Sequence, residues 1–167
     1  VNLPINSCTA TITVEDNVHP VASCKPVTVQ LDANGQGSIS TADVDDGSSD
    51  ACGIASKTLD ITDFTCANVG ANTVTLTVTD VNGNTNSCTA TITVEDNVHP
   101  VASCKPVTVQ LDVNGQGSIT TADVDDGSSD ACGIASKTLS TTDFTCANVG
   151  DNTVTLTVTD VNGNTYS

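Results

Sequence analysis

The chain has 167 residues, with 20 acidic side chains against four lysines and no arginine, which gives a net charge of −16. This charge disfavours nucleic acid and anionic membrane surfaces as partners, and no apolar run is long enough to insert into a membrane. Only 2% of the residues are aromatic, so the core is poor and needs further support. The eight cysteines are therefore expected to form disulfides, in an oxidising extracellular location.

The second half of the chain repeats the first. Residues 8–87 and 88–167 align without a gap, so the repeating unit has 80 residues and the chain is expected to fold as tandem modules. The two copies differ at six positions, which are Ala33/Val113, Ser40/Thr120, Asp60/Ser140, Ile61/Thr141, Ala71/Asp151 and Asn86/Tyr166.

In chain order, apolar and polar residues alternate at 26–31, at 73–79 and again at 89–94. Such alternation is typical of half-buried strands. Asn-Gly pairs at 34–35 and 82–83 favour type I′ hairpin turns, in which both central residues need a positive φ. No segment shows a sustained period of 3.6 residues. The sequence predicts an all-β sandwich of about seven short strands per repeat.

Three segments carry a resemblance to a known family. DNVHPVASCKPVTVQLD at 16–32, SSDACGI at 48–54 and NTVTLTVTDVNGNTNSCTATITVED at 72–96 resemble the hyalin-repeat (HYR) type of immunoglobulin-like module. Such modules occur in tandem in bacterial surface adhesins and other extracellular proteins. The resemblance implies a β-sandwich with an adhesive or structural role and no common catalytic residues.

Lettered as in an immunoglobulin-like module, the strands of the first repeat are A at 26–31, B near 37–41, C at 52–59, E near 64–68, F at 72–79 and G at 87–95. The expected domains are then 17–96 and 97–167, and the second module lacks its G strand. Residues 1–16 form an N-terminal strand of the G type that has no module of its own.

Cysteine pairing is predicted from this strand arrangement. Cys52 and Cys66 bracket strand C and the start of strand E. Cys24 precedes strand A and Cys88 opens strand G, and these two strands lie side by side in many such sandwiches. The predicted disulfides are Cys52–Cys66, Cys132–Cys146 and Cys24–Cys88, together with Cys8–Cys104 between two molecules.

Acidic residues gather in the linker, the B–C loop and the F–G loop, which meet at one pole in this topology. Carboxylates brought together repel each other, whereas Ca²⁺ takes about six to eight oxygen ligands. Turn formation by Asp and Asn is the alternative, but the run DVDDGSSD at 43–50 favours calcium. The expected ligands are Glu15, Asp16, Asn17, Asp43, Asp45, Asp46, Asp80 and Asn82 at one junction, and Glu95, Asp96, Asn97, Asp123, Asp125, Asp126, Asp160 and Asn162 at the other.

Other chemistry has less support. Each repeat has one histidine, His19 or His99, beside a linker proline, and no nucleophile pattern accompanies it, so the chain is not expected to be an enzyme. Outward-facing threonines are explained either by strand propensity or by O-linked glycans, and the sequence leaves both open. A lectin-like module is disfavoured because there is one Tyr and no Trp.

The expected function is a structural subunit of an extracellular fibre that polymerises head to tail. Residues 8–16, CTATITVED, match the missing strand of the second module and would be donated to a neighbouring molecule. Contacts between opposite ends do not close and therefore propagate as a filament. One alternative is that the sequence is a window from a longer array, in which Cys8 belongs to an upstream module. Another is a stalk segment of a long monomeric adhesin.

Overall fold

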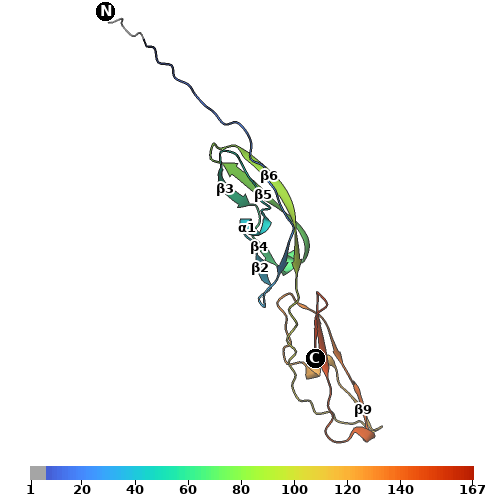
Figure 1. The fold of residues 1–167 in the computed structure, drawn as a ribbon. Coiled ribbons are helices and arrows are strands. Elements are labelled where there is room, and N and C mark those ends of the chain that lie inside the picture. Colours follow the sequence, from blue (N-terminus) through green and yellow to red (C-terminus); the bar gives the residue numbers. More distant parts are fainter. Residues whose placement is uncertain (1–6) are drawn as a thin grey trace, which may run out of the picture.

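The structure, a computed structural model, describes residues 7–167. The fold is all-β, and two modules follow one another end to end (Figure 1). Module 1 (residues 17–96) contains β1 (Val27–Gln30), β2 (Gln36–Ser38), α1 (Thr41–Val44), β3 (Ile54–Leu59), β4 (Asp63–Thr65), η1 (Cys66–Asn68), β5 (Gly70–Asp80) and β6 (Thr85–Glu95). Module 2 (residues 97–167) contains β7 (Gln116–Ser118), α2 (Thr121–Val124), β8 (Ile134–Leu139), β9 (Asp143–Thr145), η2 (Cys146–Asn148), β10 (Leu156–Asp160) and β11 (Thr165–Tyr166).

Strand β6 is an inner strand of the main sheet of module 1. The sheet has the order β1-β6-β5-β3, in which β6 runs antiparallel to β5 and parallel to β1. The apolar residues of β5 and β6 alternate with polar ones, and Val74, Val78, Ile92 and Val94 are buried. The side-chain period of two therefore sends one face of this sheet into the core, as the sequence predicted.

A smaller sheet, β2-β4, lies on the other side of the core. Ile39, Val44 and Phe64 from this layer are buried in the same cluster as the apolar face of the main sheet. The B–C segment was expected as a loop, but it contains the short helix α1. The Asp43 carboxylate accepts hydrogen bonds from the backbone N–H and the hydroxyl of Ser40 at the start of this helix, and such reciprocal capping stabilises a helical turn.

The two Asn-Gly turns form, but not as type I′. Gly35 and Gly83 have positive φ, whereas no described non-glycine residue does, so Asn34 and Asn82 do not meet the type I′ requirement. In the second turn the Asp80 carboxylate accepts hydrogen bonds from the backbone N–H groups of Asn82 and Asn84. This acceptor satisfies the turn without a left-handed asparagine.

Module 2 repeats this arrangement only in part. Residues 107–110, the counterparts of β1, form no strand, and β10 begins at Leu156 although β5 begins at Gly70, whose counterpart is Gly150. Both differences have one cause. In module 1 these segments pair with β6, and among the described residues of module 2 only β11 corresponds to it, as the counterpart of its first two residues.

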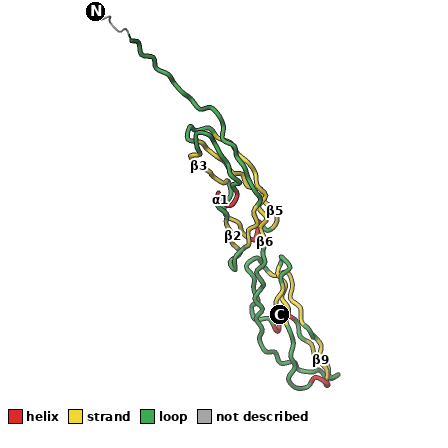
Figure 2. Tube along the Cα trace, in the orientation of Figure 1, coloured by secondary structure: helices red, strands yellow, loops and turns green. Residues whose placement is uncertain are grey.

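Residues 7–20 form no strand, and residues 7–15 lead away from module 1 as an extended segment (Figures 1 and 2). The first part of the predicted N-terminal strand, residues 1–6, lies outside the described residues. Among the residues that the structure describes, no helix has the length and apolar character needed to span a membrane.

Candidate functional site

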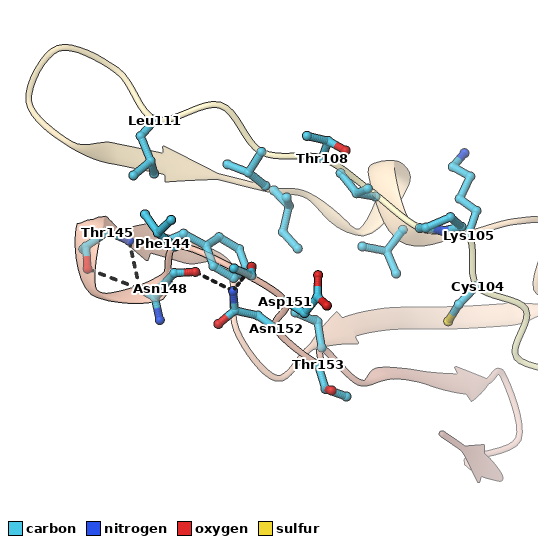
Figure 3. Close-up of a pocket in the computed structure, with 18 residues that line it drawn as sticks. Cys104, Lys105, Thr108, Leu111, Phe144, Thr145, Asn148, Asp151, Asn152 and Thr153 are labelled. Carbon is cyan, nitrogen blue, oxygen red and sulfur yellow. Dashed lines mark hydrogen bonds between the residues drawn. The ribbon is translucent and has the colours of Figure 1, made fainter.

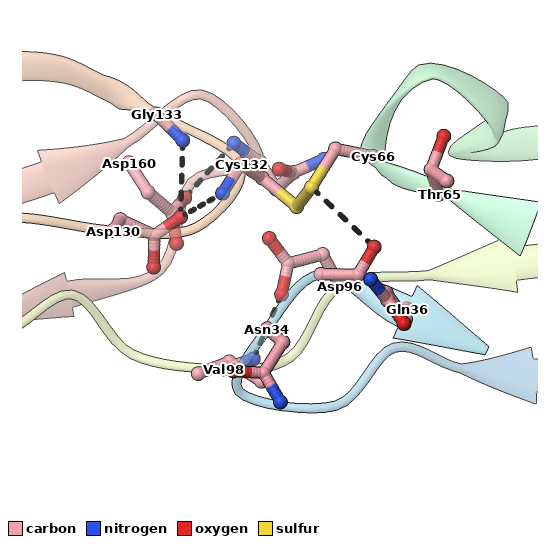
Figure 4. The surroundings of a disulfide bond; sticks show 12 residues. Asn34, Gln36, Thr65, Cys66, Asp96, Val98, Asp130, Cys132, Gly133 and Asp160 are labelled. Atoms are coloured by element: carbon pink, nitrogen blue, oxygen red, sulfur yellow. Dashed lines mark hydrogen bonds between the residues drawn. A yellow bond between two sulfur atoms is a disulfide. The ribbon is translucent and has the colours of Figure 1, made fainter.

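A disulfide between Cys66 and Cys132 ties the two modules together (Figure 4). The predicted pairs Cys52–Cys66 and Cys132–Cys146 are therefore wrong. Cys66 follows β4 at the end of module 1 that faces module 2, whereas Cys52 precedes β3 at the opposite end, so strand direction separates them. The predicted pair Cys24–Cys88 is confirmed, because it links the segment before β1 to β6, its neighbour in the sheet.

Hydrogen bonds seat the linker on module 2 beside this disulfide. The Asn164 amide donates to the Asp96 carbonyl oxygen at 3.0 Å, and Nδ1 of His99 lies 3.0 Å from the Thr165 carbonyl oxygen. The N–H of Val98 donates to the Asp96 carboxylate at 3.1 Å. We call residues 96–100 and the Cys66–Cys132 disulfide, together with the residues that contact them, the joint.

The free end of module 1 carries the same contacts. The Asn84 amide donates to the Asp16 carbonyl oxygen at 3.1 Å, Nδ1 of His19 lies 2.9 Å from the Thr85 carbonyl oxygen, and the N–H of Val18 donates to the Asp16 carboxylate at 3.0 Å. Residues 16–20 are therefore seated on module 1 as residues 96–100 are on module 2. Each module holds the linker that precedes it.

Two carboxylates face each other at the joint. Asp96 and Asp130 have oxygen atoms within 4.8 Å of one another and of Cys132 Sγ, and Figure 4 shows them on one side of the disulfide. The Asp130 carboxylate accepts hydrogen bonds from the N–H groups of Cys132 and Gly133. Asp96 is only 7% exposed, yet its Oδ2 has no hydrogen-bond partner among the described residues. A buried polar atom without a partner is unusual in proteins, and a bound cation or water is one way in which such an atom is satisfied.

At the free end, the counterparts Asp16 and Asp50 surround Cys52 in the same way. Hydrogen bonding to Asp16, followed by the negative charges of Asp16 and Asp50, raises the pKa of the Cys52 thiol above its ordinary value. The thiol form of Cys52 is therefore favoured over the thiolate.

Most other predicted calcium ligands have different roles. Asp43 caps α1 and its counterpart Asp123 caps α2, while Asp80 and Asp160 hold the turns before β6 and β11. The remaining predicted ligands that lie outside ion pairs are exposed: Glu15, Asn17, Asp46, Asn82, Glu95, Asn97, Asp126 and Asn162. The structure thus brings Asp16 together with Asp50, and Asp96 together with Asp130. Asp50 and Asp130 were not among the expected ligands. Both could have been found from the sequence, because the run DVDDGSSD occurs in each repeat and ends at Asp50 in the first and at Asp130 in the second.

Asp45 and Asp125 form ion pairs with Lys57 and Lys137 in their own modules. Burial acts to raise the pKa of Asp45, but hydrogen bonds from Lys57 and Ser48 outweigh it and hold the pKa at about 2. For Asp125 the hydrogen bond from Lys137 is the largest influence, and the pKa is again about 2. Both carboxylates are thus neutralised within a module and are not free to bind a cation at the joint.

Module 2 has an open groove where module 1 holds β6 (Figure 3). The groove has a volume of about 680 Å³ and runs between residues 104–111 on one side and 148–154 on the other. Phe144 and Val124 also line it. Val107 is exposed whereas its counterpart Val27 beside β6 is half-buried, and Val149 is 79% exposed where its counterpart Val69 is 38% exposed. The groove is therefore lined by both apolar and polar residues and is bordered by backbone that pairs with no strand.

The segment that matches this groove lies at the other end of the molecule. Residues 8–16 repeat residues 88–96 without a change, but the two copies are in opposite states. Ile92 and Val94 in β6 are 0% and 1% exposed, whereas Ile12 and Val14 are 79% and 90% exposed. We call residues 8–16 the donor segment. A complete module separates it from the groove, so the two do not meet within one molecule.

Four cysteines are unpaired in the described structure, and all are exposed: Cys8, Cys52, Cys104 and Cys146. Cys8 is in the donor segment and Cys104 lines the groove. Cys52 and Cys146 lie near the two ends of the molecule. The two disulfides that do form are typical of proteins folded outside the reducing cytoplasm.

Comparison of the chain with models of known protein families and with curated proteins found no match. The resemblance to hyalin repeats therefore stays a prediction, and the function is argued from the joint, the groove and the donor segment.

Proposed function

We propose that the chain is a structural subunit of an extracellular fibre, assembled head to tail by strand donation. The donor segment of one molecule fills the groove in module 2 of the next and becomes its missing strand. One observation carries this proposal: the same nine residues are a buried inner strand in one copy and an exposed, unpaired segment in the other. A hyalin-type module, with its structural role, fits this function.

The register of the donated strand follows from β6. Ile92 lies opposite Val27 on one side and Asn72 on the other. By the repeat, Ile12 of the incoming molecule would lie between Val107 and Asn152 of its host. Parallel pairing with 107–110 and antiparallel pairing with 150–156 would satisfy the backbone groups that border the groove.

Burial of apolar side chains supplies the driving force. Fully burying an isoleucine or valine side chain contributes about 1.5–3 kcal/mol, so Ile12 and Val14 together give a contribution comparable with the stability of a small domain. Unpaired strand edges and exposed apolar grooves promote association. The donor segment and the groove remove both liabilities at once.

In this proposal a Cys8–Cys104 disulfide links the donor segment covalently to the neighbouring molecule. In module 1 the equivalent pair, Cys24–Cys88, is bonded with its Cα atoms 5.9 Å apart. Cys8 is the counterpart of Cys88 and Cys104 that of Cys24. Strand donation would bring the two together across the molecular boundary.

We also propose that calcium stiffens the joint, at a smaller site than the sequence suggested. The unpartnered, buried Oδ2 of Asp96 and the neighbouring Asp130 carboxylate suit a hard cation that prefers oxygen. Two carboxylates are fewer than the about six to eight oxygen ligands that Ca²⁺ takes, so water or backbone carbonyls would complete the shell.

Non-reducing electrophoresis of the native material, followed by electron microscopy, tests the proposal. A ladder of covalent multimers that collapses to one short chain on reduction, together with thin filaments, is the expected result. The alternative function is a stalk segment of a long monomeric adhesin, in which a continuation of the same polypeptide supplies the strand. A single very long polypeptide that survives reduction would establish that alternative and contradict strand donation between molecules.

The donor segment is tested separately by the Ile12→Asp variant of the 167-residue chain. A carboxylate at this position would be buried against Val107 without a partner, so assembly should be lost. Ile61→Asp is the matched control, because Ile61 is exposed and the second repeat already has the polar Thr141 at its place. The control variant should form the same ladder as the unchanged chain.

A further inference from the structure

The disulfide at the joint has an unused copy in the repeat. Cys146 is the counterpart of Cys66 and Cys52 is the counterpart of Cys132. Cys66 and Cys132 are bonded across the joint, whereas Cys52 and Cys146 are both unpaired and exposed. No pairing within a module explains these two cysteines, because in the bonded copy the partner belongs to the neighbouring module.

Cys52 and Cys146 lie at opposite ends of the molecule. Cys52 is close to Asp16, where the N-terminal segment leaves module 1, and Cys146 lies directly after β9, at the far end of module 2 in Figure 1. They cannot meet within one molecule. In a head-to-tail pair of molecules, however, these two ends face each other.

Each cysteine already has the surroundings of its bonded counterpart. A Cβ atom on Gly35 would lie 2.5 Å from Cys66 Sγ, and one on Gly115 would lie 2.5 Å from Cys146 Sγ. Likewise, the Cys132 N–H donates to the Asp130 carboxylate and the Cys52 N–H donates to the Asp50 carboxylate, both at 2.8 Å. Cys52 and Cys146 therefore have, in the single molecule, the same neighbouring groups as the bonded cysteines Cys132 and Cys66.

The linker contacts indicate that the boundary between two molecules would have the same geometry as the joint between the two modules of one chain. Residues 16–20 are held on module 1 by the same hydrogen bonds that hold residues 96–100 on module 2. A donor segment placed in the groove in the register of β6 would therefore orient the incoming module 1 as module 2 is oriented now. Cys52 would then approach Cys146 as Cys132 approaches Cys66, whose Cα atoms are 5.2 Å apart.

One of the six differences between the repeats falls at this boundary. Ala33 borders a depression at the joint together with Val98 and Val101, and its counterpart Val113 is fully exposed in the single molecule. At the boundary between molecules, Val113 would meet Val18 and Val21, which are exposed on the free end of module 1. The larger valine side chain would add apolar contact at the boundary between molecules, where two separate chains have to associate.

We propose that every boundary between molecules carries a second covalent link, a disulfide between Cys146 of one molecule and Cys52 of the next. The proposal rests on strand donation, which brings the ends together. Oxidised glutathione or another small disulfide is the oxidant. One cysteine thiolate attacks it and releases one thiol, and the second cysteine thiolate then attacks the mixed disulfide and releases the other, so two protein thiols are oxidised as one disulfide is reduced to two thiols.

Together with Cys8–Cys104, this bond would give two independent covalent links per boundary. Cys8–Cys104 holds the donated strand in the groove, while Cys146–Cys52 fixes the orientation of one molecule on the next. The fibre would then repeat, at every boundary between molecules, the construction that the chain shows between its own modules.

Peptide mapping of assembled fibres tests the bond directly. The 167-residue chain is assembled with reduced and oxidised glutathione, free thiols are blocked with N-ethylmaleimide, and the fibres are digested with trypsin without reduction. Cleavage after Lys137 releases residues 138–167, which contain Cys146 as their only cysteine. We expect this peptide to remain bound to the fragment that contains Cys52. Its release as a blocked, free peptide from fibres that are visible by electron microscopy would overturn the second link and leave strand donation intact.

Mixed assembly gives a second measurement. In a Cys8→Ser, Cys104→Ser background, the Cys52→Ser variant and the Cys146→Ser variant should each give no covalent multimers alone. Mixed together, they should give covalent dimers and nothing larger, because each pair of molecules retains one Cys146 and one Cys52. A mixture without dimers would contradict the bond. If the unchanged chain forms neither filaments nor a ladder, the proposed function fails and this inference fails with it.

Discussion

Cys66 and Cys132 are 66 residues apart in the sequence, but their Cα atoms lie 5.2 Å apart across the boundary between two modules. The bond therefore supports the arrangement of the modules more than the fold of either one. By contrast, Cys24–Cys88 joins two neighbouring segments inside a single module. One disulfide thus lies within a module and the other links the two modules.

Removing each bond should consequently have a different effect. Cys24→Ala with Cys88→Ala should destabilise module 1 by about 4 kcal/mol, because that disulfide closes a long loop of the unfolded chain. Cys66→Ala with Cys132→Ala should change the melting temperature less but broaden the distribution of molecular lengths in small-angle scattering. The first variant serves as the control for the second. Equal scattering curves for the joint variant and the unchanged chain would contradict the assigned role.

The sequence identifies the strands because their signal is local. Alternation at 73–79 and 89–94 became the paired strands β5 and β6, and the adjacency of strands A and G located Cys24–Cys88 correctly. The Cys66–Cys132 bond was missed because the prediction looked for the partners of these two cysteines within their own modules. The direction of strand C argued against a Cys52–Cys66 bond, because this strand runs from the end of the module near Cys52 to the end near Cys66.

The candidate cation site was only partly predictable for a related reason. A run of aspartates indicates negative charge but not which partners each carboxylate finds. Asp43 is used by a helix that the sequence did not reveal, and Asp45 by a lysine twelve residues away. One oxygen of Asp96 and the same oxygen of its counterpart Asp16 are buried without a hydrogen-bond partner, which no sequence pattern indicates. Such assignments depend on tertiary contacts.

A free peptide with the sequence of residues 7–16, SCTATITVED, should inhibit fibre growth. It carries the apolar residues and the cysteine of the donor segment but no module behind it, so it would fill the groove and terminate the filament. We expect shorter filaments and a protein band increased by one peptide mass on non-reducing gels. A peptide with aspartate in place of Ile12 should have no effect, because a charge would be buried against Val107. Equal inhibition by both peptides would argue against insertion into the groove.

Stability should fall steeply between pH 4 and pH 2. The pKa values of Asp45 and Asp125 are about 2, below the value of about 4 for an aspartate in an unfolded chain. A carboxyl with a lowered pKa in the folded state stabilises the fold fully above the unfolded value, and this contribution disappears as the pH falls toward the folded value. Melting temperatures measured from pH 5 to pH 2 should therefore decrease less in an Asp45→Asn, Asp125→Asn variant than in the unchanged chain.

Asp46→Asn with Asp126→Asn provides the control for this experiment. These aspartates are adjacent to the first pair and exposed, but their side chains take part in no ion pair in the described structure. The control should follow the pH dependence of the unchanged chain. If it flattens the curve as much as the Asp45 and Asp125 substitutions do, the ion pairs with lysine are not the cause.

Calcium should act at the joint through Asp96 and Asp130, not through the whole set of acidic loops. An ion that binds only the folded state raises its stability by about 2.7 kcal/mol at a free concentration of about 100 times its Kd, so adding Ca²⁺ after chelation should raise the melting temperature. Asp96→Asn with Asp130→Asn should reduce this calcium-dependent increase, because it removes the unpartnered oxygen and its neighbour at the joint and leaves only the matching Asp16 and Asp50 cluster at the free end. Asp46→Asn with Asp126→Asn should retain the increase, since these exposed side chains do not belong to the cluster at the joint. Calorimetric titration of the same variants measures binding without unfolding, and unchanged binding in the Asp96→Asn, Asp130→Asn variant would locate the ion elsewhere.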